Sequence, residues 1–109
     1  MTDKIKAMIN FAIRARKYTI GENVIQIGKN GKVRLALLAL DCSSATKKKY
    51  SDKLNFYQIP YIEYGTKEEL GSLLNKNEIS LFAITDVNIA KQIKKLVKED
   101  ETNGLQKQK

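Results

Sequence analysis

The stretch VRLALLAL, Val33–Leu40, is apolar at every position except Arg34. Such a run is typical of a β-strand buried on both faces, because a strand with one face in water alternates apolar and polar side chains. We therefore expect this segment to be the central strand of a sheet, with Leu35, Leu37 and Leu40 buried.

Apolar periodicity and turn residues predict the other elements. Asp3 and Asp86 are expected to cap helices, Gly31 is expected to end one, and Thr66 with Glu69 has the spacing of a capping box. In chain order the elements are a helix over 3–16, a β-prone segment over 18–20, a helix over 22–30, a helix after Ser43 or Ser44, a core strand over 60–64, a short helix after Thr66, a strand over 79–85 and a last helix after Asp86.

Strands that alternate with helices indicate an α/β fold. We expect one domain over residues 1–98, a three-layer α/β/α sandwich around a small mixed sheet, followed by a polar, disordered tail over 99–109. No apolar run approaches the roughly 20 residues that cross a bilayer, so no membrane association is expected. The single cysteine, Cys42, is interpreted as a small buried residue in a cytoplasmic protein.

The charge of the chain is strongly basic. Twenty Lys and Arg residues against 12 Asp and Glu give a formal net charge of +8. Residues 98–109 contain three bases and three acids, so the whole excess lies on the body of the chain. A polyanion is the natural partner of such a body, although a solvated lysine coat has the same composition, and the run Lys47–Lys49 is interpreted as solvated surface.

Residues that support catalysis are scarce. The chain has no histidine and neither of the glycine-rich phosphate-binding motifs. Asp41 and Asp86 follow separate strands without a third acid, and Asp86 is better explained as a helix cap. We therefore predict a protein that is not an enzyme and has no metal or cofactor.

The segment TIGEN, Thr19–Asn23, lies where the second helix begins and has two interpretations. The first is a turn at Gly21 with Asn23 as a helix cap. The second is a binding site for a phosphate, because the first N–H groups of a helix have no partner within it. The segment alone leaves both open.

Motifs along the body, taken in order, indicate a family. GEN opens the second helix, NGKVRLALLALD leads out of it, and IPYIEYGTKEELG and ISLFAITD follow. From Ala15–Lys17 to the last helix, this series resembles the kink-turn RNA-binding superfamily of ribosomal proteins, and most closely its small bacterial, YlxQ-like branch. TKEELG is the most specific of these motifs.

The resemblance implies a three-layer sandwich that binds RNA without catalysis. Gly21 and Asn23 match the family segment that enters the kinked groove of the RNA, and the loop Lys76–Ile79 would cover a flipped-out nucleotide. Val24 replaces a glutamate of the family, Gln26 falls where a lysine is expected, and Asn75 stands where many members have glycine. The expected RNA-binding residues are Gly21, Glu22, Asn23, Gln26, Lys29, Lys32, Asp41, Lys67, Asn77, Glu78 and Ile79.

The expected partner is structured RNA, either ribosomal RNA or another kink-turn RNA, bound by a monomer in ribosomes or their assembly. Ribosomal or translation proteins are further expected partners. The alternative is a protein-interaction module of the same fold whose RNA face is weakened, which Val24 and Gln26 favour and the net charge opposes. A small-molecule-binding or phospho-accepting enzyme would need an acid cluster around Asp41.

Overall fold

A four-stranded mixed sheet forms the centre of the molecule. The computed structural model describes the backbone of residues 1–107 and the side chains of residues 1–100. The strands are β1 (Tyr18–Ile20), β2 (Leu35–Leu38), β3 (Tyr61–Glu63) and β4 (Leu81–Ile84), in the order β1-β4-β2-β3. Because β4 is antiparallel to β1 and β2, and β2 is parallel to β3, the C-terminal ends of β1, β2 and β3 lie at the same end of the sheet as the start of β4.

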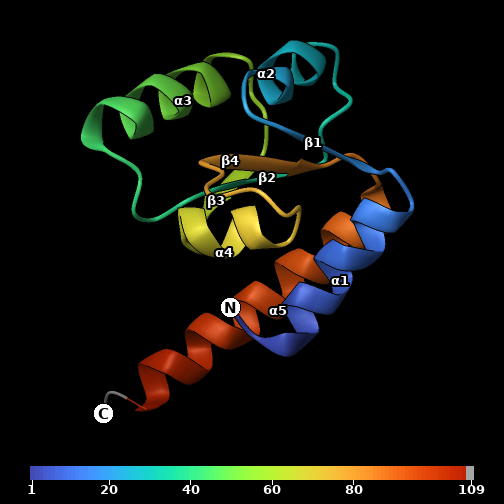
Figure 1. The fold of residues 1–109 in the computed structure, drawn as a ribbon, viewed down its shortest axis with the longest axis vertical. Helices are drawn as coiled ribbons and strands as arrows, with labels where there is room; N and C mark the ends of the chain where they lie inside the picture. The colour runs from blue at the N-terminus through green and yellow to red at the C-terminus, as the bar shows by residue number, and fades with distance from the viewer. Residues whose placement is uncertain (108–109) are drawn as a thin grey trace.

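Helices cover both faces of this sheet. α2 (Glu22–Gly28) and α3 (Ser44–Phe56) pack on one face, whereas α1 (Asp3–Arg14), α4 (Lys67–Ser72) and α5 (Val87–Lys107) lie on the other (Figure 1). This arrangement confirms the predicted three-layer α/β/α sandwich.

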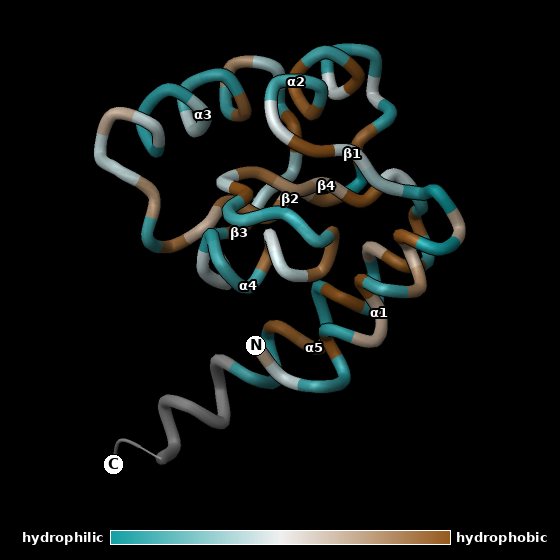
Figure 2. The backbone as a smooth tube through the Cα atoms, in the orientation of Figure 1, coloured by the Kyte–Doolittle hydropathy of each residue, from teal (hydrophilic) through white to brown (hydrophobic). Residues whose placement is uncertain are grey.

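The side chains of β2 explain why its sequence is apolar throughout. Leu35 and Leu37 enter the core beneath α1 and α5, while Ala36 and Leu38 enter the second core beneath α2 and α3. Figure 2 shows the same concentration of hydrophobic residues along β2 and β4. Leu40 was expected to be buried but is 53% exposed, because the ladder ends at Leu38 and the chain has left the sheet by that point.

Two of the predicted strands differ from those observed. The segment 60–64 was predicted as a core strand, but β3 is an edge strand whose Glu63 is exposed and whose Tyr61 and Ile62 are only half-buried. An edge position suits a strand preceded by Pro60, since proline cannot donate to a ladder. The predicted strand over 79–85 is confirmed in shorter form as β4.

Local capping residues begin three of the helices as predicted. Ser43 accepts a hydrogen bond from the Thr46 N–H at 3.2 Å, and Asp86 accepts one from the Ile89 N–H at 2.9 Å. Thr66 and Glu69 form the predicted capping box.

The bounds of the first two helices required correction. Thr2, not Asp3, caps α1, which ends at Arg14 because Arg16 takes a left-handed φ of 58°. α2 ends at Gly28 rather than at Asn30, although Gly31 has the expected positive φ of 73°.

The last helix continues beyond the predicted boundary of the domain. α5 extends from Val87 to Lys107, and residues 108–109 lie outside the described part of the chain. The division into a domain over 1–98 and a disordered tail over 99–109 therefore stays a prediction. Among the described helices, none combines the length and the apolar character that crossing a membrane requires.

Candidate functional site

Most of the predicted site residues meet at one end of the sheet. Gly21–Asn23 follows β1, Asp41 follows β2, Lys67 begins the helix after β3, and 77–79 leads into β4. The topology places these four connections together, because three strands end and one begins there. We call the resulting surface the strand-end surface; its residues are Gly21, Glu22, Asn23, Asp41, Lys67, Asn77, Glu78 and Ile79.

Gly21 forms the turn between β1 and α2. Its φ of 61° and ψ of −142° are strongly disfavoured for any other residue, and its N–H donates to the Leu81 carbonyl at 2.9 Å. A Cβ placed on Gly21 would meet no atom within 4 Å. Glycine is therefore required by the backbone conformation, and the space in front of it is open.

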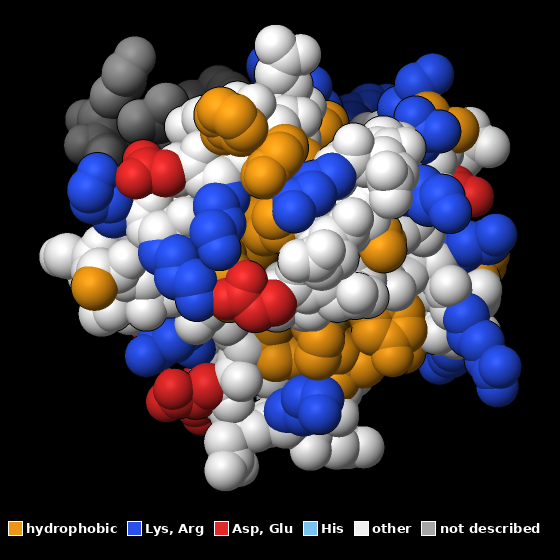
Figure 3. Space-filling view, turned by 90° about the horizontal axis from the view of Figure 1, so that it is seen from above, with side chains coloured by type: hydrophobic (Ala, Val, Ile, Leu, Met, Phe, Trp, Pro, Cys, Tyr) orange, Lys and Arg blue, Asp and Glu red, His pale blue; other side chains and the backbone are white. Residues whose placement is uncertain are grey.

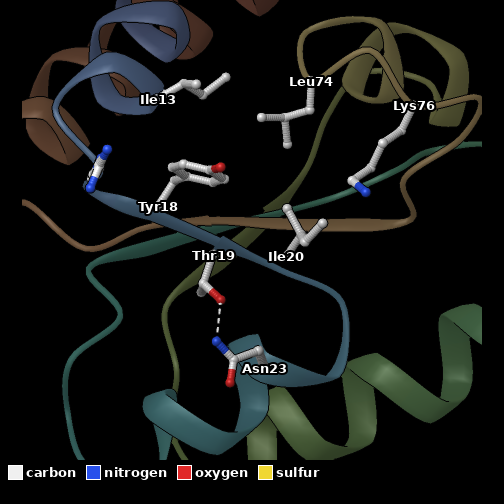
Figure 4. Close-up of a pocket in the computed structure, with 8 residues that line it drawn as sticks. Ile13, Tyr18, Thr19, Ile20, Asn23, Leu74 and Lys76 are labelled. Atoms are coloured by element: carbon white, nitrogen blue, oxygen red, sulfur yellow. Dashed lines mark hydrogen bonds between the residues drawn. The ribbon is translucent and has the colours of Figure 1, made fainter.

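Asn23 does not cap α2, so this part of the first interpretation of TIGEN is wrong, although the predicted turn at Gly21 is confirmed. Gly21 is the N-cap residue, and no side chain caps the helix. The Asn23 Nδ2 instead donates to the Thr19 Oγ1 at 2.7 Å, and Thr19 is only 7% exposed. This bond holds the exposed Asn23 amide, whose Oδ1 faces away from Thr19 (Figure 4).

Asp41, Lys67 and the loop before β4 are joined by hydrogen bonds. The Lys67 N–H donates to the Asp41 Oδ1 at 2.8 Å, and the Ile79 N–H donates to the Lys67 carbonyl at 3.0 Å. The Lys67 Nζ also lies 3.5 Å from the Glu78 Oε2. The side chain of Ile79 is 6% exposed and packs in the core, so it supports the loop from within.

The glycine of the TKEELG motif allows this loop to lie against α4. A Cβ on Gly71 would be 2.7 Å from the Lys76 carbonyl oxygen and 2.9 Å from the Asn77 carbonyl group. Asn75 turns the chain with a φ of 56°, a left-handed conformation that asparagine tolerates better than most residues. The conformation of the loop thus depends on the close contact at Gly71.

Glu22 is paired with α3. Its carboxylate forms an ion pair with Lys49, and the Lys53 Nζ lies 3.9 Å away. The hydrogen bond from Lys49 lowers the pKa of the Glu22 carboxyl below its ordinary value. Lys47 and Lys48 also have acidic partners, Glu63 and Asp52, each at 3.1 Å. Lys48 and Lys49 are exposed, as predicted, and Lys47 is partly exposed, but each of the three charges is paired with a carboxylate.

An open groove beside β1 was not predicted. Its volume is about 580 Å³, and it lies between the end of α1, the edge of β1 and the loop after α4 (Figure 4). Arg16 and Lys76 supply its positive charge, and Asn23 lines it as well. The sequence contains no local signal for this groove, because it forms where the stretch from Ile13 to Asn23 meets Leu74 and Lys76, which are distant in the chain.

Comparisons with known proteins agree with this architecture. Residues 3–96 match the ribosomal protein L7Ae/L30e/S12e/Gadd45 family. The chain belongs to this family.

Two relatives in the L7Ae family are similar over most of their length. The RNA-binding protein YlxQ of Bacillus subtilis (strain 168) is 37% identical over 87 residues, which cover 79% of this chain and 87% of that protein. The RNA-binding protein YlxQ of Enterococcus faecium is 34% identical over 95 residues, which cover 86% and 91% respectively. These relatives place the chain in the YlxQ-like branch.

A solved structure has the same fold. It is described as a protein with unknown function from Bacillus halodurans C, and it superposes with a TM-score of 0.79 at 32% identity. The match covers 89% of this chain and 99% of the solved one.

Three of the predicted RNA-binding residues, Gln26, Lys29 and Lys32, lie outside the strand-end surface in this L7Ae-family fold. α2 runs from the end of β1 back toward the start of β2, so Lys29 and Lys32 lie at the end of the sheet opposite Gly21. Lys17 and Arg34 are at that end too, since their backbones bond to Thr85 and Ile84 at the end of β4. Gln26 is exposed on α2 between the two ends.

The strand-end surface offers few groups for metal or acid–base chemistry. Among the described residues, no three His, Cys, Asp or Glu side chains are grouped so that they could hold a metal ion. The surface presents the oriented Asn23 amide and the open turn at Gly21. Its charged residues are Lys67 and the acids Glu22, Asp41 and Glu78, and Lys76 lies next to it in the loop before β4. The amide is suited to hydrogen bonding, and the two lysines are suited to phosphate.

Proposed function

We propose that this chain is a non-catalytic RNA-binding protein that recognises structured, kink-turn-like RNA through the strand-end surface. The observation that carries the proposal is the Asn23 amide, held by Thr19 at 2.7 Å beside the open Gly21 turn. The two YlxQ relatives are named RNA-binding proteins, which supports the same conclusion.

The geometry at Gly21 and Asn23 suits the edge of a nucleobase. An amide can both donate and accept hydrogen bonds, and one that is already oriented loses less freedom when a base binds. The absent side chain at Gly21 lets a base or its sugar approach the backbone closely. A kink-turn presents the edges of its sheared G·A pairs in an opened groove, so it matches such a shallow polar surface.

The charge of the chain supplies the attraction that does not depend on RNA sequence. A kink brings two phosphate backbones together, and cationic side chains that contact them release condensed counterions. The net charge of +8, with Lys67 and Lys76 beside the strand ends, is consistent with this. We propose ribosomal RNA, in mature or assembling ribosomes of the cytoplasm, as the RNA that a monomer of this protein binds.

A protein-interaction module is the second candidate, and specific contacts favour it. Val24, where the family has a glutamate, is fully buried, so this position presents no side chain to RNA. Glu78 lies 3.5 Å from Lys67 and offsets its charge. A chain that had lost RNA recognition would then dock on translation proteins through the same fold.

Two variants test the proposal against a kink-turn RNA and a plain duplex of equal length. Asn23→Ala should weaken binding to the kink-turn RNA by roughly 1–3 kcal/mol and affect the duplex much less, because only the kink-turn offers sheared pairs. Lys76→Ala is the control for charge, because Lys76 lines the same groove as Asn23. It should weaken both RNAs about equally and lower the salt slope by about one unit.

Thermal melts separate recognition from stability. Losing the bond to Thr19 should cost Asn23→Ala about 1 kcal/mol of folding free energy, so the protein stays folded at 25 °C. Equal losses of affinity on the two RNAs would show that Asn23 does not read the kink-turn, and the proposal would then be wrong.

A further inference from the structure

Two aromatic side chains are exposed where α3 ends. Phe56 is 78% exposed and Tyr57 is 37% exposed. Their rings meet edge to face, with centroids 4.9 Å apart and planes at 89°. Neither the folding of the sheet nor the strand-end surface uses the exposed ring of Phe56.

Cations and an amide lie near the Tyr57 ring. The Lys29 Nζ lies 5.0 Å from the centroid of the Tyr57 ring. An open cavity of about 390 Å³ separates the end of α2 from the connection between α3 and β3, and Lys29, Arg34, Tyr57 and Gln58 are among the residues that line it. None of its described lining residues is acidic. Figure 3 views the α2 and α3 layer from above and shows hydrophobic side chains exposed among Lys and Arg.

We propose that this surface is a second RNA site, which binds unpaired nucleotides of single-stranded RNA. We call it the aromatic–basic surface; it consists of Lys29, Arg34, Phe56, Tyr57 and Gln58. A base stacks on the ring of Phe56, its phosphate lies between Lys29 and Arg34, and the Gln58 amide is within the same cavity. Stacking platforms combined with a positive groove are the general means by which proteins bind single strands.

RNA fits this surface better than an apolar protein segment does. Burying Phe56 and Tyr57 against an apolar partner would also desolvate Lys29 and Arg34, whose charges would then lack a counterpart. A phosphate backbone neutralises both cations while its bases cover the rings. The two cations therefore favour a polyanion, and the exposed rings favour one whose bases have flat apolar faces.

The position of the surface suggests how it would cooperate with the strand-end surface. The two lie at opposite ends of α2, which has seven residues and so spans about 10 Å. A structured RNA at Gly21 with a single-stranded extension has only the length of α2 to cross before it reaches Lys29, which lies beside Tyr57. Binding of one RNA molecule to both surfaces rests on the proposed function. Binding of an isolated single strand to the aromatic–basic surface does not.

The test compares Phe56→Ala with Phe11→Ala, a matched control on α1 whose phenylalanine is 59% exposed. The probes are an oligouridine of about ten nucleotides and a kink-turn RNA with and without a single-stranded extension. Phe56→Ala should weaken binding to the oligouridine and to the extended RNA by about 5- to 150-fold, and leave the unextended RNA unchanged. Phe11→Ala should leave all three affinities unchanged. A photoreactive 5-iodouridine in the oligouridine should crosslink to Phe56 or Tyr57.

Asn23→Ala makes failure of this proposal distinguishable from failure of the proposed function. It should weaken binding to the kink-turn RNA while leaving binding to the oligouridine unchanged. The inference of a second site is wrong if Phe56→Ala binds the oligouridine as tightly as the unaltered chain does, or if Phe11→Ala loses as much. A chain that does not bind the oligouridine at low salt would also overturn it, and would leave a protein as the partner for these rings.

Discussion

Gly71→Ala should disturb the strand-end surface from within α4. The new Cβ would lie 2.7 Å from the Lys76 carbonyl oxygen and 2.9 Å from two backbone atoms of Asn77. All three are backbone atoms, so no side chain can rotate away to relieve the contact. The loop that leads into β4 has to retreat by several tenths of an ångström, and it carries Lys76 and Asn77 with it.

Two opposing effects set the change in unfolding free energy of Gly71→Ala. Overpacking of a well-packed site costs about 1–3 kcal/mol. Replacing glycine with alanine inside a helix raises the free energy of unfolding by about 1 kcal/mol, because alanine has the higher helix propensity. The net expectation is a loss of about 1 kcal/mol of unfolding free energy, which lowers Tm by about 4–8 °C in a domain of this size. Affinity for the kink-turn RNA should also fall, because the displaced loop belongs to the proposed RNA surface.

Thermal melts and RNA titrations of Gly71→Ala and Ser72→Ala check this reasoning. Ser72 is the next residue of the same helix but is exposed, so its substitution should change stability by no more than about 0.5 kcal/mol. If Gly71→Ala instead raises Tm and leaves RNA affinity unchanged, helix propensity has outweighed the contact with the loop. The argument that Gly71 sets the conformation of this loop would then be refuted.

Two further predictions concern solution conditions. The affinity for RNA should fall steeply as the salt concentration rises. Each phosphate contact should add about 0.7–0.9 to the slope of log affinity against log salt concentration. An affinity that stays constant between low and physiological salt would favour the protein-interaction module. The Met1 ammonium, 2.9 Å from Glu69, lowers the pKa of the Glu69 carboxyl from its usual 4.5. Because the folded pKa is the lower one, the stability from Glu69 is present above that usual value and is lost as the pH falls through the folded pKa. Tm should therefore decline more steeply below about pH 5 in the unaltered chain than in Glu69→Gln, and parallel declines would contradict this.

The sequence by itself determined the features that depend on neighbouring residues. The apolar run at Val33–Leu40 predicted a central strand, because only a strand covered on both faces needs so few polar side chains. Thr66 and Glu69 predicted their capping box, since both partners lie within one helical turn. The ordered motifs predicted the family, which the match over residues 3–96 confirms. The family in turn implied the three-layer sandwich, which the structure confirms.

Only the tertiary structure decided which of these residues share a surface. Asn23 was a plausible cap in the sequence, yet the turn at Gly21 places its amide against Thr19. Lys29 is close to Asn23 in the chain, but α2 carries it to the opposite end of the sheet, beside Tyr57. Asp41 and Lys67 are 26 residues apart and joined by a hydrogen bond. The direction of each strand sets these distances, and strand direction follows from pairing between distant segments, which no local pattern encodes.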